Sequence, residues 1–501
     1  MAYKVIHKFT PKPSLATPKN IAIVGGGIAG LASAYRLLKS TSKQTPPPEI
    51  HIYEANNYLG GRIYTIEDPF DHGGYLEGGA ELIDSAQSEL IKLANELGLE
   101  MEDIGIPDDP AEDYYYIKGN LYSPLDLLHD GGAKALFDEI VKDHSRSLTP
   151  EKLHKQKKNP RLDWSPYAKQ LDSMSLDEYL DTVGTRTNTP PELIAFIKKA
   201  YQSELGKNPK KISALAFVNG FDPSRLPNGD GFFVYGNSDE SLRIKGGTSQ
   251  LTRRLHEYLE ASGVHFHLNY QLQGISESTD KKWPGVDLHF NKGSIPVDGV
   301  ILTLPMPRMK KLEGLQAMMP DKQWRLMQNV GYGCHKKVML ELKDEPWKKL
   351  PLTPAPNGVF CTDNPYLQHC WITQRGPHSI LTCFVGEQAA FSMDEEKLVD
   401  GIKHAYSTML GGMAASDIFA NKEPIIMRWP NSYVCPAPNQ YINMESLPDP
   451  VCGGRVQFAG DACNRQFNGF MGAAVCSARH AAHGIATTLQ IDNDLGKTRH
   501  Y

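Results

Sequence analysis

A glycine-rich turn between two apolar segments is the feature that most constrains the fold of this chain. Ile21–Val24 is a short apolar run, and the turn Gly25–Gly30 behind it reads G-x-G-x-x-G. Apolar side chains then recur at the spacing of one helix face, at Leu31, Ala34, Tyr35 and Leu38. After the polar loop Ser40–Pro48, a second strand is expected over Ile50–Tyr53. Strand, helix and strand in this order predict the βαβ unit of a dinucleotide-binding fold.

The positions in this turn have different expected functions. Gly25 makes the tight turn, Gly27 lets a pyrophosphate approach the backbone, and Gly30 lets the helix pack on the strand. The first helix amides, at Ile28 and Ala29, then face the phosphates. A purely structural glycine turn without a ligand is the alternative.

An acidic residue and a second glycine-rich loop favour FAD over NAD as the ligand. Glu54 closes the second strand, where its carboxylate can accept hydrogen bonds from ribose hydroxyls. The chain continues through Ala55 to Gly60, Gly61 and Arg62. Two more glycine amides and a guanidinium suit a longer, buried pyrophosphate ligand. A surface ion pair is the alternative role for Arg62.

Composition excludes several classes of function. The 501 residues suffice for two or three domains, and a net charge of −5 argues against a nucleic-acid partner. No apolar run suggests a signal peptide or a membrane anchor. The eight cysteines form no CxxC pair and the histidines lack ligand spacing, so no disulfide framework and no metal site are expected. A cytoplasmic protein with reduced thiols is the expectation.

Four segments resemble the flavin-dependent amine oxidase family, which includes monoamine, polyamine and L-amino-acid oxidases. They are Glu54–Arg62, Gly78–Ile83, Asp298–Pro305 and Phe458–Asp461, and the resemblance runs from Ile21 to about Ala486. It implies an α/β fold: a discontinuous Rossmann-like FAD-binding domain with an α+β substrate domain and a mostly helical insertion, which we place over about Leu99 to Lys211.

The resemblance also implies how the domains alternate along the chain. The expected divisions are an N-terminal arm at 1–20, FAD-binding parts at 21–98, 241–304 and 431–489, substrate-domain parts at 99–240 and 305–430, and a C-terminal tail at 490–501.

The resemblance places further residues at the cofactor. Gly79, Ala80 and Glu81 would pass beside the flavin ring, and Leu272 would clasp the adenine. Gly460 and Asp461 would meet the ribityl and phosphate region. Gly469, Phe470 and Met471 would open the last helix, with backbone amides facing the pyrimidine edge, where negative charge develops on reduction.

Three side chains are implied in the chemistry. Lys337 matches the family's lysine that holds a water against flavin N5; burial would favour its neutral form, and Lys336 would point to the opposite strand face. Tyr433 and Phe470 match two rings that sandwich the substrate amine. The segment Trp429–Tyr433 is shorter than in monoamine oxidases, which leaves core aromatics as the alternative for these rings.

Two departures from the family bear on cofactor and substrate. Ser432 stands where monoamine oxidases tether FAD through cysteine, so non-covalent FAD is expected. Glu81 occupies the place of an arginine that binds the substrate carboxylate in L-amino-acid oxidases, which favours a cationic amine; Arg375 and Arg428 are the other candidates for a carboxylate.

The resulting prediction is an FAD-dependent oxidase of a small amine that uses O2 and forms hydrogen peroxide. The alternatives are an L-amino-acid oxidase, a desaturase on the same fold, and a flavin-bound scaffold or sensor without turnover. A homodimer is compatible with each of these.

Overall fold

A five-stranded parallel sheet forms the centre of the dinucleotide-binding half. The computed structural model describes residues 18–41, 46–104, 114–129, 132–148, 164–223, 233–279, 284–349, 359–374, 378–464 and 468–491. The sheet order is β21 (Val456–Phe458), β13 (Gly299–Leu302), β1 (Asn20–Val24), β2 (Glu49–Tyr53) and β9 (His265–His267). Three separate stretches of sequence supply it, as a discontinuous Rossmann-like fold predicts.

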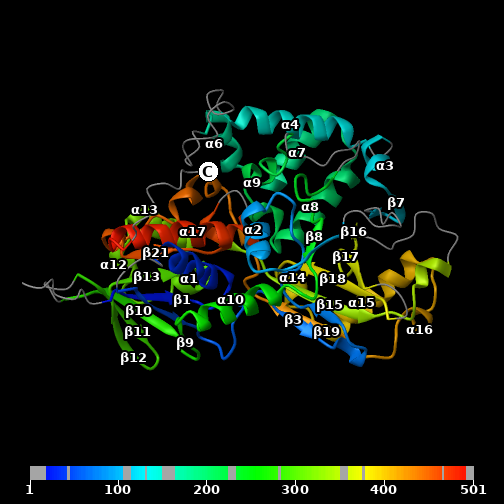
Figure 1. Cartoon of the computed structure of the whole chain (residues 1–501). Coiled ribbons are helices and arrows are strands. Elements are labelled where there is room, and N and C mark those ends of the chain that lie inside the picture. The colour runs from blue at the N-terminus through cyan, green and yellow to red at the C-terminus, as the bar shows by residue number, and fades with distance from the viewer. Residues whose placement is uncertain are drawn as a thin grey trace, which may run out of the picture.

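The alternation along β1 explains why both faces of this sheet are covered. Ile21 and Ile23 lie in the apolar core between the sheet and the helices on its first face. Ala22 and Val24 lie in the apolar core on the opposite face of the sheet. The helices on the first face are α1 (Ile28–Thr41), α2 (Ser88–Glu96), α10 (Ser249–Ala261) and α17 (Met471–Thr488). The opposite face meets an antiparallel meander of β10 (Leu272–Glu277), β11 (Val286–Phe290) and β12 (Gly293–Val297). In Figure 1, blue α1 and red α17 lie together, and they pack on each other.

A mixed seven-stranded sheet forms the other half of the molecule, at the right of Figure 1. Its order is β19 (Ile425–Trp429), β15 (His335–Glu341), β18 (Ile380–Gly386), β17 (His369–Gln374), β16 (Val359–Thr362), β6 (Tyr114–Ile117) and β7 (Asn120–Tyr122). Every residue of β15 is buried, because this strand lies inside the sheet and is covered on both faces.

A helical layer covers one side of this sheet, at the top of Figure 1. It contains α4 (Lys134–Ser147), α6 (Pro166–Ser173), α7 (Leu176–Thr187), α8 (Pro191–Leu205) and α9 (Ala214–Val218), which share one apolar core. A capping box fixes the start of α7, where Ser175 and Glu178 satisfy each other's backbone amides.

Short elements complete the described part of the chain. The small sheets pair β3 (Thr65–Glu67) with β4 (Tyr75–Glu77), β5 (Met101–Asp103) with β8 (Leu242–Ile244), and β14 (Gly331–Tyr332) with β20 (Val434–Cys435). The remaining helices are α3 (Pro124–His129), α11 (Met306–Met309), α12 (Leu315–Met318), α13 (Asp321–Asn329), α14 (Gln388–Phe391), α15 (Glu395–Met409) and α16 (Ala415–Ile418). Short 3₁₀ helices lie at Pro69–Asp71, Pro209–Lys211, Pro346–Lys349, Tyr441–Ser446, Cys452–Gly454 and Asp461–Cys463. No helix in these ranges has the length and apolar content to cross a membrane.

The structure corrects one detail of the expected elements and adds a strand to them. The stretch from Leu99 to Lys211 is not helical throughout, because β6 and β7 extend the seven-stranded sheet through the pairing of β6 with β16. The structure also contains β12, a strand that the sequence pattern did not indicate and that begins at Gly293. That strand holds Pro296 and lies at the edge of its sheet, where a missing N–H is tolerated, so its pattern is hard to detect from sequence.

Candidate active site

One cavity of about 1010 Å³ connects the carboxyl ends of the parallel strands with the seven-stranded sheet. This volume reaches the upper end of the roughly 300–1,000 Å³ found for small-molecule sites, so a large ligand fits. The predicted residues that line it are Gly25, Gly27, Ile28, Ala29, Glu54, Ala55, Gly61, Arg62, Gly79, Ala80, Glu81, Leu272, Lys337, Tyr433, Gly460, Asp461, Gly469, Phe470 and Met471. Gly30 does not line the cavity.

The glycine turn is shaped for close approach of a ligand to the backbone. Gly25 has φ of +115°, and a Cβ there would lie 2.4 Å from Thr303 Oγ1. A Cβ on Gly27 would meet no atom closer than 3.8 Å, so this backbone is open towards the cavity. A Cβ on Gly30 would lie 1.9 Å from Gly25 O, so Gly30 serves the packing of α1 on the turn.

Two helices direct their N-termini at the cavity. α1 begins at Ile28 and α17 at Met471, and both residues line it. The first amides of a helix have no partner within the helix and carry a partial positive charge. The two ends therefore suit a ligand with negative charge at two separated places, such as a pyrophosphate and a reduced flavin ring.

Glu54 is fixed in place by backbone and side-chain donors. It is 8% exposed; its Oε2 accepts from Gly26 N at 2.7 Å, and its Oε1 accepts from Asn56 N at 2.9 Å and from Asn56 Nδ2 at 2.7 Å. A carboxylate has about four lone-pair sites, so ribose hydroxyls can still donate to it.

Arg62 and Asp461 form a bidentate ion pair at the cavity wall. Arg62 donates to Asp461 Oδ1 at 2.6 Å, to Oδ2 at 2.8 Å, and to Ser432 O at 2.7 Å. Burial by itself would lower the pKa of Arg62, but the Asp461 charge more than offsets this and the net pKa is raised. The sequence assigned both groups to the ligand, whereas in the structure each largely neutralises the other.

Lys337 meets a carboxylate inside the cavity. Its Nζ lies 2.7 Å from Glu81 Oε2 and 3.3 Å from Gly79 O, and Trp371 Nε1 donates to Glu81 Oε1 at 3.4 Å. Lys336 points to the opposite face of β15, where it donates to Met393 O at 2.6 Å.

This ion pair corrects two expectations. Lys337 is not isolated in the cavity but has a buried carboxylate as its partner. Glu81 is already paired, so it is not an unpaired negative charge that would attract a cationic amine.

The predicted aromatic pair stands in the cavity, but the rings are not parallel walls. The ring centroids of Tyr433 and Phe470 are 6.3 Å apart with an interplanar angle of 42°. The shortened loop before Tyr433 is anchored, because Trp429 Nε1 donates to Gly78 O at 2.8 Å. Burial raises the pKa of Tyr433 well above its ordinary value, so the phenol stays neutral.

Ser432 contacts a buried histidine through its hydroxyl. Its Oγ forms a hydrogen bond with His335 Nδ1, and the other ring nitrogen of His335 bonds Ser203 O at 2.7 Å. Burial lowers the pKa of His335 to about 4, so this imidazole is neutral near pH 7.

Several residues in the cavity carried no signal in the sequence. Glu204, Glu240, His369, Trp371 and Phe384 line its part near the seven-stranded sheet, and Glu204 Oε2 lies 3.5 Å from His369 Nδ1. They come from α8, a loop, β17 and β18, and tertiary packing alone brings them together.

The arginines proposed for a substrate carboxylate are not placed there. Arg428 forms an ion pair with Glu395 and does not line the cavity. Arg375 lies outside the described residues.

The sequence matches the family model described as flavin containing amine oxidoreductase over residues 28–486. The chain belongs to this family. Members of the family use FAD, so the chain is an FAD-dependent oxidoreductase. The glycine backbone open to the cavity and the two helix N-termini fit this cofactor.

Individual relatives are distant but match over nearly the whole chain. Amine oxidase [flavin-containing] A of Sus scrofa is 23% identical, covering 94% of this chain and 85% of the relative. Lysine-specific histone demethylase 1 of Schizosaccharomyces pombe is 22% identical, covering 94% of this chain and 50% of the relative.

Solved structures of amine oxidases share the fold. Cyclohexylamine oxidase from Brevibacterium oxydans has a TM-score of 0.75 at 19% identity, covering 95% of this chain and all of that one. Wild-type putrescine oxidase bound to putrescine has a TM-score of 0.73 at 20% identity, covering 94% of this chain and 99% of that one.

Proposed function

We propose that this protein oxidises a small amine at the carbon next to the nitrogen. The observation that carries the proposal is the continuity of the cavity, which runs from the glycine turn to a chamber with Tyr433, Phe470 and the Lys337–Glu81 ion pair. FAD, when bound, supplies the acceptor for the hydride equivalent. The amine becomes an imine that water hydrolyses, and O2 takes the two electrons and two protons to give hydrogen peroxide.

The chain's own residues would hold FAD along the cavity. Gly25, Gly27 and the start of α1 face the pyrophosphate, Glu54 accepts from the ribose, and Leu272 lies against the adenine. The segment Gly79–Glu81 borders the ring system. Gly79, Ala80 and Glu81 all line the cavity, which supports this role. No cysteine lines the described cavity wall, which supports non-covalent binding.

The aromatic side chains would orient the amine. Tyr433 and Phe470 offer apolar ring faces to its carbon chain. Because the two rings are tilted relative to each other, the space between them is wedge-shaped and does not have parallel walls. Lys337, held by Glu81 and Gly79 O, would order a water beside the reacting atoms. The neighbouring Trp371 ring, 5.1 Å from the Lys337 ammonium, restricts access of bulk water to this point.

The charges in the chamber favour an amine over an amino acid. Glu204 and Glu240 line the chamber, and a substrate carboxylate there would be repelled. Among the described residues, the arginines of the cavity lining are Arg62, which Asp461 engages, and Arg308 of α11, directly after strand β13 of the parallel sheet. Neither offers a free guanidinium in the aromatic chamber.

The test is anaerobic mixing of the FAD-loaded protein with a panel of monoamines, diamines and L-amino acids. We expect amines to bleach the flavin absorbance and, on admission of air, to give one peroxide per amine consumed. Bleaching by L-amino acids alone would replace the amine with an amino acid as substrate. Bleaching by none of the panel would favour the non-catalytic scaffold.

A further inference from the structure

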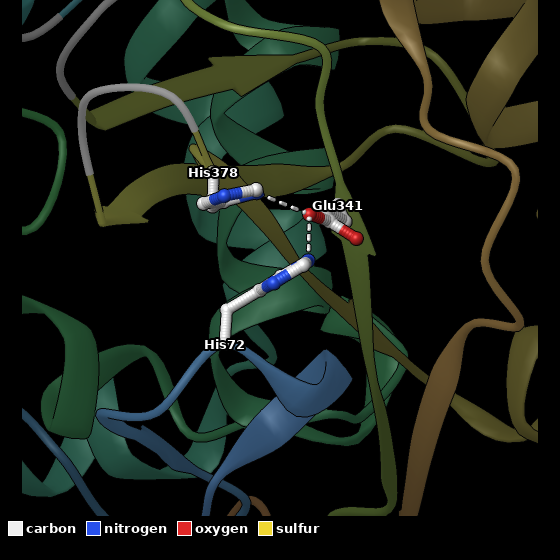
Figure 2. Close-up of side chains that lie close together, drawn as sticks. All are labelled: His72, Glu341 and His378. Atoms are coloured by element: carbon white, nitrogen blue, oxygen red, sulfur yellow. Dashed lines mark hydrogen bonds and ion pairs between the residues drawn. The ribbon is translucent and has the colours of Figure 1, made fainter.

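A cluster of two histidines and one glutamate lies outside the cavity. Glu341 Oε1 is 2.9 Å from His72 Nε2 and 2.8 Å from His378 Nδ1, and Figure 2 shows the two rings reaching this oxygen from different segments. His72 comes from the loop before β4, Glu341 ends β15, and His378 precedes β18. Their ligand atoms all lie within 4.8 Å of one another.

The carboxylate of Glu341 is buried and has room for a further ligand. The side chain is 4% exposed, and its second oxygen, Oε2, is buried without a hydrogen-bond partner in the described structure. Within the described ranges, its ion-pair contacts are the two imidazoles. The two imidazole rings stack with centroids 3.7 Å apart, and each directs one ring nitrogen at the same carboxylate oxygen. A bound cation would place a positive charge beside this buried carboxylate.

We propose that His72, Glu341 and His378 bind a divalent transition metal ion of the zinc class. Two imidazole nitrogens and one carboxylate oxygen form a ligand set that Zn²⁺ accepts at about 2.0–2.2 Å. Imidazole favours Zn²⁺, Ni²⁺ or Cu²⁺ over Mg²⁺ and Ca²⁺, which prefer oxygen ligands. The ion would replace the shared hydrogen bonds, and each imidazole would turn its lone pair inward. Both histidines are exposed, so the ion can enter and water can complete its shell.

The position of the cluster gives the metal a structural role. Along β15, Lys337, Met339 and Glu341 face the same side because strand residues alternate. Lys337 contacts Glu81, Met339 packs with Leu76 in a small apolar cluster, and Glu341 contacts His72.

The chain segment 72–81 thus contacts β15 at three residues, Glu341, Met339 and Lys337. The C-terminal end of this segment, from Gly79 to Glu81, lines the cavity. A metal ion bound at the N-terminal end of the segment, at His72, would fix the segment to the seven-stranded sheet. The spacing of the three ligands in sequence could not reveal the site, because His72 lies far along the chain from Glu341, and His378 follows Glu341 only after 37 positions.

The experiment measures metal binding to the FAD-loaded full chain after treatment with a chelator. Calorimetric titration with Zn²⁺ should show one ion per chain. His72→Gln and His378→Gln should each weaken this binding at least about tenfold. His404→Gln, on an exposed turn of α15, is the matched control and should bind like the wild type. Equal affinity in the wild type and both cluster variants would overturn the site.

Two further measurements separate a specific site from weak surface binding. Zn²⁺ should raise the thermal unfolding midpoint of the wild type and of His404→Gln, and should leave that of the cluster variants unchanged. The FAD content of each variant shows that it folds. Mg²⁺ should bind far more weakly than Zn²⁺; equal binding of the two ions would overturn the assignment to a transition metal.

Discussion

The ammonium of Lys337 lies 2.7 Å from the carboxylate of Glu81, and the two side chains are only 3% and 5% exposed. This pair joins β15 to the segment that borders the proposed flavin position. Its burial means that each charge depends on the other, because an unpaired ion in such a site has no water to stabilise it. The effects of substitutions at Lys337 therefore combine stability with chemistry, and the two must be measured separately.

Lys337→Met should slow reoxidation of the reduced flavin by O2 and change flavin reduction by substrate little. Oxygen reduction builds negative charge that a nearby cation or its ordered water stabilises. Stopped-flow measurement of each half-reaction decides this, with Lys336→Met as control because that side chain lies on the other strand face. Equal behaviour of both variants would contradict the role of Lys337, and a defect confined to reduction would move the role to substrate binding.

The same variant should also lose stability, and a second substitution should restore part of it. Lys337→Met leaves Glu81 buried and unpaired, which costs about 3–5 kcal/mol. Lys337→Met/Glu81→Gln removes the uncompensated charge and should unfold closer to the wild type, while reoxidation stays slow. Denaturant unfolding of the single and double variants measures the coupling. A double variant no more stable than Lys337→Met would contradict the ion pair.

Glu54→Leu should weaken FAD retention by about 1–3 kcal/mol, roughly 5- to 150-fold in affinity. The leucine leaves ribose hydroxyls and the Gly26 amide without their acceptor. Glu54→Gln keeps one acceptor oxygen and should lose less. Fluorescence titration of the apoprotein with FAD checks the order; unchanged affinity in Glu54→Leu would show that Glu54 does not hold the ribose.

Stability should fall as pH rises from about 4.5 to 7 because of Glu77. Burial raises the pKa of this carboxyl from 4.5 to about 7, although Thr248 N–H and the Thr65 hydroxyl donate to it. The folded state therefore holds the proton in a range where the unfolded chain has lost it, and raising the pH removes that stabilisation, by roughly 3 kcal/mol at most.

The check is the thermal midpoint measured across this pH range. Glu77→Gln does not titrate and should show a flatter profile than the wild type. Glu67→Gln, at an exposed position of β3 in the same hairpin, should keep the wild-type profile. An identical slope in Glu77→Gln and the wild type would rule out this carboxyl as the source.

Acid precipitation should release intact FAD into the supernatant. The residue in the tethering position is Ser432, whose hydroxyl contacts His335. Flavin spectra of the pellet and the supernatant check this, and flavin that stays with the pellet would contradict non-covalent binding.

Local pattern was sufficient to predict the nucleotide-binding unit. Gly30 is required by a contact within the same turn, because a Cβ there would lie 1.9 Å from Gly25 O, whereas the close contact of Gly25 is with Thr303, far away in the sequence. The opposite orientation of Lys336 and Lys337 follows from the alternation of any strand. Helical preference over Leu99–Lys211 predicted too much helix, because the pairing of Tyr114–Ile117 with β16 overrides local propensity.

The sequence by itself thus determined the α/β fold, the family and many of the residues that line the cavity. Only the tertiary structure decided which charges meet. Arg62 pairs with Asp461 across 399 positions and Lys337 with Glu81 across 256, and both pairs join groups that sequence reasoning had assigned to the ligand. Glu204 and His369 in the chamber, and His72 beside Glu341, are likewise brought together by packing. The reason is physical: periodicity reports which face of an element is buried, but contacts between elements depend on how whole sheets and helices pack.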